Sequence, residues 1–127
     1  MKIASILENQ KVEKRIAITP EIAKKYISLG FEVLLSENYG GHLGIKDKEY
    51  NELGVTTSNN EKEVITNADI IVQLGLLSDD KNSLLKENQT FIGVLNPYDN
   101  KDKINYLVKK KINTFSLELL PRITRAQ

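Results

Sequence analysis

The sequence predicts an α/β fold of three layers, in which helices cover both faces of a mostly parallel open sheet. Short apolar runs typical of strands alternate along the 127 residues with amphipathic segments typical of helices. Residues 69–74 (DIIVQL) are apolar almost throughout, as expected for a central strand that is buried on both faces. Very short connections, such as Gly30 between a helix and the next strand, favour parallel neighbours joined by right-handed crossovers.

The first predicted helix has signals at both of its ends. Thr19 can cap it, and Pro20 suits the first helical position because the fixed φ of proline is already helical. Ile22 and Leu29 fall near one face at helical spacing. Gly30 is suited to end the helix, since glycine readily adopts the positive φ that terminates many helices.

Similar patterns divide the rest of the chain into elements. Strands are expected at residues 2–7, 31–35, 55–57, 69–74, 90–95 and 112–117. Helices are expected at residues 20–29, 47–53, 61–66, 79–86 and 100–111. Five or six strands that alternate with helices are typical of a flavodoxin-like or Rossmann-like sheet. No linker or internal repeat interrupts the pattern, so residues 1–127 are predicted to form one domain.

The composition argues against several classes of function. A net charge of +1 creates no general attraction for nucleic acid or for an anionic membrane. With no cysteine and one histidine, His42, the chain offers neither a thiolate metal centre nor a multi-histidine one. No apolar run approaches the roughly 20 residues that span a bilayer, and the amino terminus lacks the pattern of a signal peptide. We therefore expect a cytoplasmic protein that uses no metal and binds no nucleic acid.

Residues 40–44 (GGHLG) are the nearest approach to a phosphate-binding loop. They have neither the GxGxxG spacing of a dinucleotide site nor the Lys-Ser/Thr pair of a P-loop. We interpret them as a glycine turn that needs positive φ, with His42 exposed in the loop. No dinucleotide-binding fingerprint occurs elsewhere in the sequence.

Arginine is rare in this chain, with 3 residues against 15 lysines, and its positions are informative. Arg15 follows the first predicted strand, so it should lie at the carboxyl edge of the sheet, where open α/β sheets bind ligands. It could be a carboxylate clamp or one more surface cation. The rarity of arginine slightly favours the clamp, because lysine cannot replace the planar guanidinium fork.

The closing segment, residues 121–127 (PRITRAQ), holds the other two arginines just beyond the last predicted strand. Pro121 favours a loop there, which places Arg122 where a guanidinium can meet a phosphate or carboxylate. Asn96 follows another strand and either lines a pocket or belongs to a turn, and the role of Glu118 stays open. A ligand-facing loop at this position suggests a site that is completed by further chain after Gln127.

The sequence resembles the N-terminal domain shared by alanine dehydrogenases and the alpha subunits of NAD(P) transhydrogenases. The resemblance extends over the whole chain. Its most specific segment is the closing PRITRAQ. The other matching segments are residues 15–21 (RIAITPE), 29–33 (LGFEV) and 67–71 (NADII).

The resemblance implies a larger enzyme, in which this domain packs against a following Rossmann-type domain that binds NAD and is absent from residues 1–127. NAD(H) lies in the cleft between the two domains, and Arg122 and Gln127 carry over as contacts to this cofactor. A hydride passes to NADP bound on a partner component, coupled to proton translocation by a membrane component. The resemblance further implies homodimers of the full protein, held at the inner face of the membrane by partner subunits.

Two departures from the family favour the transhydrogenase branch. Alanine dehydrogenases have a lysine where Gly75 stands and a histidine where Asn96 stands, and reduction of an imine needs a proton donor of that kind. The alternatives are an alanine dehydrogenase-like oxidoreductase that uses Arg15 to hold a substrate carboxylate, or a non-catalytic α/β binding module. In the transhydrogenase interpretation no residue of this domain is catalytic, and the 127-residue chain alone is expected to be inactive.

Overall fold

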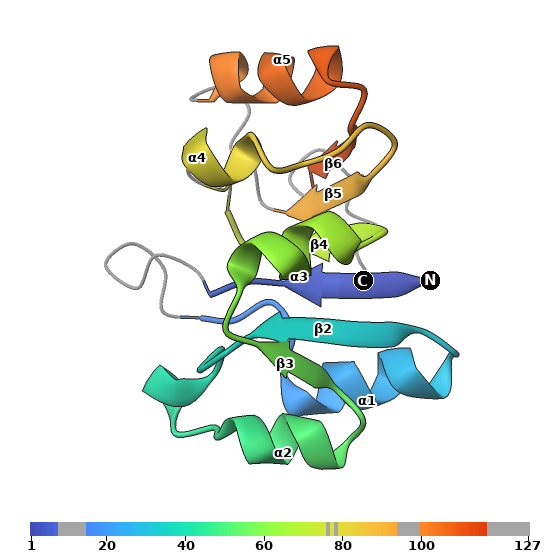
Figure 1. Cartoon of the computed structure of the whole chain (residues 1–127), viewed down its shortest axis with the longest axis vertical. Helices are drawn as coiled ribbons and strands as arrows, with labels where there is room; N and C mark the ends of the chain where they lie inside the picture. The colour runs from blue at the N-terminus through green and yellow to red at the C-terminus, as the bar shows by residue number, and fades with distance from the viewer. Residues whose placement is uncertain (8–14, 76, 78, 94–99, 117–127) are drawn as a thin grey trace, which may run out of the picture.

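The computed structural model describes residues 1–7, 15–75, 77, 79–93 and 100–116. Six strands form one sheet in the order β3-β2-β1-β4-β5-β6, and every neighbouring pair is parallel (Figure 1). The strands are β1 (Lys2–Ser5), β2 (Glu32–Ser36), β3 (Thr56–Ser58), β4 (Ile70–Val72), β5 (Thr90–Gly93) and β6 (Asn113–Ser116). The helices are α1 (Pro20–Ser28), α2 (Asp47–Glu52), α3 (Glu61–Asn67), α4 (Asp79–Asn82), α5 (Lys101–Lys109) and the 3₁₀ helix η1 (Gly41–Leu43).

The predicted fold class is confirmed, and the sheet is parallel throughout the described residues. Two elements are shorter than predicted. Helix α4 ends at Asn82 instead of residue 86, because the chain turns there and places Leu85 in the core. Strand β4 covers three residues instead of six, and Gln73 lies just beyond its end.

The start and end of α1 follow the sequence signals. The backbone of Thr19 is extended, and its Oγ1 accepts a hydrogen bond of 3.3 Å from the backbone N–H of Ile22. Gly30 follows the C-cap Leu29 with a φ of +97°, so the predicted glycine terminator is confirmed. These signals are local, which explains why the sequence alone was enough to predict them.

Two apolar clusters lie on opposite faces of the sheet. One lies between the sheet and α3, α4 and α5, and the other between the sheet and α1 and α2. The first contains Ala4, Ile6, Val64, Ile65, Ala68, Ile71, Leu77, Leu85, Phe91, Leu107 and Ile112. The second contains Ile3, Ile16, Ile18, Ala23, Val33, Leu35, Tyr39, Tyr50 and Val55. The predicted arrangement of three layers is therefore present.

Helices α1 and α2 lie over the β1–β3 half of the sheet only (Figure 1). On this face Leu35 in β2 is fully buried. Across the sheet on the same face, Val72 and Ile92 are half-buried, and Phe115 at the edge is 53% exposed. Burial on this face thus falls from the first half of the sheet to the second.

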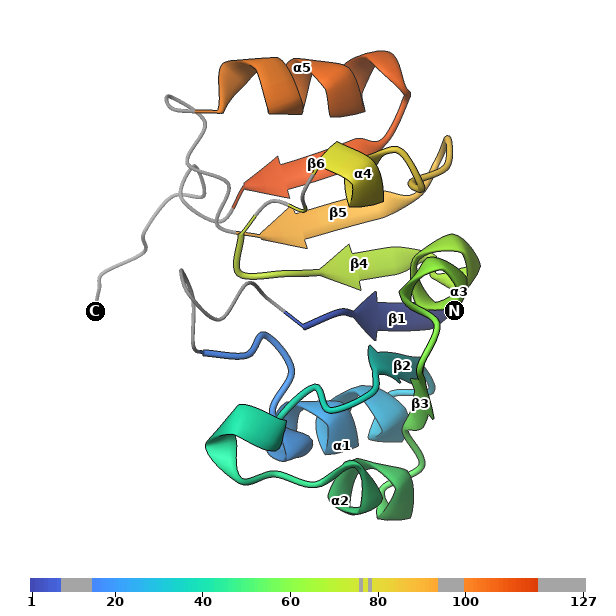
Figure 2. The same ribbon diagram turned by 60° about the vertical axis from the view of Figure 1, so that its left-hand side comes forward.

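The strand order creates a topological switch point between β1 and β4. From β1 the chain continues to α1 on one face, whereas from β4 it continues to α4 on the other face. All strands point the same way, so their carboxyl ends share one edge of the sheet (Figure 2). In open α/β sheets the crevice outside this point of the carboxyl edge is the usual ligand site.

Candidate functional site

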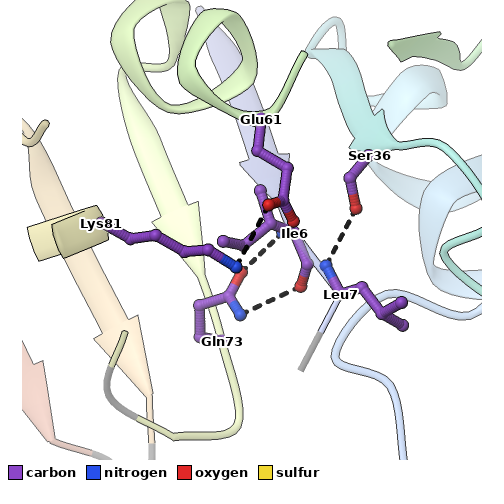
Figure 3. Close-up of polar contacts among 6 residues, drawn as sticks. All are labelled: Ile6, Leu7, Ser36, Glu61, Gln73 and Lys81. Carbon is purple, nitrogen blue, oxygen red and sulfur yellow. Dashed lines mark hydrogen bonds and ion pairs between the residues drawn. The ribbon is translucent and has the colours of Figure 1, made fainter. Parts of the chain in front are cut away.

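Gln73 occupies the switch point. Its side chain is 1% exposed and reaches from the end of β4 to the residue that follows β1 (Figure 3). Gln73 Oε1 accepts a hydrogen bond of 2.7 Å from the backbone N–H of Ile6, and Gln73 Nε2 donates one of 3.1 Å to the carbonyl oxygen of Ile6. Both backbone groups of Ile6 are therefore satisfied by one side chain.

These two bonds fix the orientation of the Gln73 amide. The N–H of Ile6 needs an acceptor and its carbonyl needs a donor, so rotating the amide by half a turn would break both bonds. Gln73 Oε1 also accepts a hydrogen bond of 2.9 Å from the Ser5 hydroxyl. A buried amide with this set of partners is held rigidly, because each lost partner would leave a polar group desolvated and unpaired.

The network continues from Ser5 to Tyr39, which follows β2. The Ser5 and Tyr39 hydroxyl oxygens are 2.8 Å apart, and both residues are fully buried. Since Ser5 has one hydroxyl proton and gives it to Gln73, Tyr39 must be the donor to Ser5. The chain of hydrogen bonds thus runs in one direction, from Tyr39 through Ser5 to Gln73.

The Tyr39 hydroxyl also holds the segment before α1. It accepts hydrogen bonds from the backbone N–H groups of Ala17 and Ile18, at 3.0 and 3.1 Å. Tyr50 in α2 donates a hydrogen bond of 2.8 Å to the carbonyl oxygen of Ile18. The rings of Tyr39 and Tyr50 meet edge to face, with centroids 6.1 Å apart.

The environment of Tyr50 favours the neutral phenol. Burial raises its pKa well above the ordinary value, and the neighbouring Tyr39, Glu49 and Asp47 raise it further. A neutral Tyr50 keeps the proton that it donates to Ile18. The phenol is therefore a structural hydrogen-bond donor and does not act as a base at neutral pH.

Arg15 lies at the carboxyl edge of the sheet, close to the hydroxyl network. Ala17, two residues further on, is bound to Tyr39, which is bound in turn to Ser5 at the end of β1. Arg15 itself is exposed and has interaction partners. The structure thus agrees with the position predicted for Arg15, whereas its clamp role stays a prediction.

The other predicted site residues lie outside the described residues. These are the two proposed cofactor contacts, Arg122 and Gln127, together with Asn96 and Glu118. Their roles therefore remain predictions. Gly75, which stands where alanine dehydrogenases have a lysine, lies within the described residues and has no side chain to donate a proton.

The glycine loop after β2 is a folded turn. Both carboxylate oxygens of Asp47 accept from the N–H of Asn38, at 3.0 and 3.1 Å, and Gly44 ends η1 with a φ of +80°. A Cβ on Gly40 would lie 2.9 Å from the Cβ of Ile45, so close packing also requires glycine there. His42 is exposed, as predicted. The loop therefore fits the interpretation of residues 40–44 as a turn.

A partly exposed ion pair lies on the face of α3 and α4. The Lys81 ammonium is 3.1 Å from a carboxylate oxygen of Glu61, and the pair joins the start of α3 to α4 (Figure 3). Next to it, the N–H of Leu7 donates a hydrogen bond of 2.9 Å to the Ser36 hydroxyl (Figure 3). The chain that leaves β1 is therefore bound by side chains from the strands on both sides of it.

Sequence reasoning did not identify Gln73, Ser5, Tyr39 or Tyr50 as site residues. The available signal was a polar residue near the end of an apolar strand, as Gln73 is in DIIVQL and Ser5 in KIASIL. Buried polar side chains need partners, so such positions suggest contacts between neighbouring strand ends. The partners themselves are 34 to 68 positions apart in the sequence and could not be assigned from it.

Within the described residues no cluster of three or more histidine, cysteine, aspartate or glutamate side chains could hold a metal ion. A search of the same residues finds no helix long and apolar enough to cross a membrane. The site is thus defined by the carboxyl edge of the sheet and its network of hydroxyl and amide groups.

The comparisons with known proteins agree on one family. The model for "Alanine dehydrogenase/PNT, N-terminal domain" matches residues 6–127. The first portion of NAD(P) transhydrogenase subunit alpha from Rickettsia prowazekii (strain Madrid E) is 40% identical over 131 residues, covering 100% of this chain and 34% of that protein. The protein of the same name from Rhodospirillum rubrum is 34% identical over 132 residues, covering 100% and 34%.

A solved structure gives the same result. The crystal structure of transhydrogenase from Sinorhizobium meliloti matches with a TM-score of 0.88 and 32% sequence identity, covering 98% of this chain and 37% of that chain. The 127 residues thus span about a third of the length of the relatives that they match.

Proposed function

The chain belongs to the family of alanine dehydrogenase/PNT N-terminal domains, and we propose that it forms one wall of the NAD(H) cleft in an NAD(P) transhydrogenase. One observation carries the proposal. The whole chain is 40% identical to the transhydrogenase subunit alpha protein of Rickettsia prowazekii, of which it spans 34%. In this proposal the following domain is a Rossmann-type NAD-binding domain that supplies the other wall.

The geometry of the carboxyl edge supports this role. Hydride transfer between two nicotinamides needs close alignment and exclusion of water, and the cofactors themselves carry the chemistry. The buried amide of Gln73 and the hydroxyl network around Tyr39 form a rigid edge at the switch point. A rigid wall with no proton donor at Gly75 suits hydride transfer better than imine reduction.

In the proposed enzyme Arg122 and Gln127 contact the bound NAD(H) from the segment that follows β6. NADP(H) binds on a partner component, and a membrane component couples the transfer to proton translocation. This arrangement would hold the present domain at the cytoplasmic face of the membrane, and the full protein would pair as a homodimer.

The test uses the full-length protein that contains this domain, with NADH binding measured by calorimetry. Hydride transfer to an NADP analogue is measured in the presence of the NADP-binding component. Arg122→Ala is expected to weaken NADH binding about tenfold, the effect of losing a charge-assisted hydrogen bond. Lys24→Ala, on the exposed side of α1, is the matched control and should bind normally.

Two results would contradict the proposal. One is a full-length protein that neither binds NADH nor transfers a hydride. The other is oxidation of L-alanine with NAD as the main activity, abolished in Arg15→Ala, which would establish the alanine dehydrogenase-like alternative. The isolated 127-residue chain is expected to fold and to show no transfer.

A further inference from the structure

We propose that Tyr39, Ser5 and Gln73 form a positioning relay, which holds the segment carrying Arg15 in place at the cleft so that its guanidinium meets an anionic group of the bound nucleotide. The inference rests on the proposed function and extends it to residues with no predicted role. The relay residues are buried, so they act through the segment and do not themselves touch the ligand.

The loop between β1 and α1 is anchored where it leaves the sheet. Gln73 binds both backbone groups of Ile6, and Ser36 accepts from the N–H of Leu7 (Figure 3). These anchors come from β4 and β2, the two strands that flank β1. The departure of the loop is therefore fixed relative to the centre of the sheet.

The same loop is anchored again where it returns. Tyr39 accepts from the N–H groups of Ala17 and Ile18, and Tyr50 donates to the carbonyl of Ile18. Ile16 and Ile18 are buried in the cluster under α1 and α2. Arg15 is thus the exposed residue directly before a segment that is held by apolar packing and by three hydrogen bonds.

The relay joins the two anchors. The Tyr39 hydroxyl, which holds the return of the loop, donates to Ser5, and Ser5 donates to Gln73, which holds its departure. Each donor and acceptor in this chain has one arrangement that satisfies its neighbours. Removing one hydroxyl therefore leaves buried groups unpaired at both ends of the loop, and chains of this kind couple more strongly than isolated pairs.

The relay has a consequence for ligand binding. A guanidinium binds a phosphate or carboxylate best when its fork is already in position, because ordering a mobile segment opposes binding. Loosening the segment should therefore weaken the affinity for NADH even though no contact to the nucleotide is removed. The effect should be absent when Arg15 is missing, since the relay acts through that residue.

The experiment is a double-mutant cycle on the full-length protein, with the dissociation constant for NADH measured by calorimetry. Arg15→Ala and Tyr39→Phe should each weaken binding by roughly tenfold, the effect of one hydrogen bond to a charged or buried group. The double variant should bind no more weakly than Arg15→Ala alone, because coupled residues do not add. Tyr26→Phe, which keeps its ring contact with Phe31 outside the relay, should bind like the wild type.

A second measurement follows the segment directly. Hydrogen–deuterium exchange of the full-length protein should be faster in the peptide containing Ala17 and Ile18 in both Tyr39→Phe and Ser5→Ala. Exchange in β5 should be unchanged, which shows that the fold is intact. The Ser5→Ala variant provides an independent test if Tyr39→Phe proves too unstable to purify.

The outcomes separate the relay from the proposed function. A full-length protein without NADH binding overturns the proposed function, and the exchange measurement then still tests the anchoring of the segment. Normal NADH binding by Tyr39→Phe overturns the relay and leaves the proposed function standing. Additive losses in the double variant, or unchanged exchange at Ala17 and Ile18, also overturn it.

Discussion

The two halves of the sheet differ in how their shared face is covered. In the β1–β3 half, α1 and α2 bury Leu35 completely and enclose the hydroxyl groups of Tyr39 and Tyr50. In the β4–β6 half, the same face leaves Ile92 half-buried and Phe115 mostly exposed. The reason is the direction of winding: α3, α4 and α5 follow the crossover to the opposite face, and no helix of the described chain returns.

The contrast teaches that strand sequence alone does not set burial. Leu35 and Phe115 lie on the same face of one sheet, and both follow the alternation typical of strands. Their different exposure comes from helices that are distant in the sequence. Stability and site geometry should therefore depend mainly on the β1–β3 half.

Substitutions on the shared face should show the largest difference between the halves. Leu35→Ala is expected to lower the free energy of unfolding by about 3 kcal/mol, because it removes buried methyl groups and leaves a cavity. Phe115→Ala should lower it by less than about 1 kcal/mol, since the exposed ring loses little packing. Urea unfolding of the 127-residue chain measures both. Equal losses would mean that the two halves are covered alike.

Tyr50→Phe should have an intermediate effect that depends on pH. At pH 8 the loss of the hydrogen bond to Ile18 should lower the free energy of unfolding by about 1–2 kcal/mol. Folding raises the pKa of Tyr50, so the folded state binds this proton more tightly than the unfolded state. The stability from the neutral phenol is complete below about pH 10, the ordinary pKa of tyrosine, and falls as the pH rises above it.

The gap in stability between the wild type and Tyr50→Phe should therefore narrow as the pH rises above about 10. Tyr106→Phe, in the exposed side of α5, is the control and should follow the wild type at every pH. A gap that stays constant to high pH would show that burial of the Tyr50 phenol does not disfavour its ionisation.

The ion pairs should give the smallest effect and a fine comparison of the halves. Glu61→Gln removes the carboxylate that lies 3.1 Å from Lys81, and a pair this exposed contributes about 0–1 kcal/mol, less at high salt. Glu52→Gln removes the partner of Lys48 within α2, where both side chains are mostly exposed, and should change less still. Thermal unfolding at low and high salt measures both variants. A larger loss for Glu52→Gln would contradict this order.

Much of the fold could be predicted because its signals are local. Cap residues such as Thr19, terminators such as Gly30 and the apolar run at residues 69–74 each act on their own neighbourhood. The order of the strands could not be derived in the same way, because it depends on which face each crossover takes. The early end of α4 was also missed, since burial of Leu85 overrides the helical pattern.

The site was predicted only in outline. Arg15 could be placed at the carboxyl edge, because a residue that follows a strand in a parallel sheet must emerge there. The residues that hold its segment could not be found, because Gln73 and Tyr39 join positions that are far apart in the sequence. Polar residues at strand ends were the available signal, and they indicate that a partner exists without identifying it.

The pairing of β1 with β4 is short, and it is extended at both ends by side chains of the residues that flank β4. The ladder joins Ile3 to Ile70 and Ala4 to Ile71. On the amino side Asp69 Oδ2 accepts from the backbone N–H of Lys2 at 2.7 Å, and on the carboxyl side Gln73 takes both backbone groups of Ile6. The two side chains act as surrogate backbone, so the strands can diverge at a crevice while their polar groups stay paired.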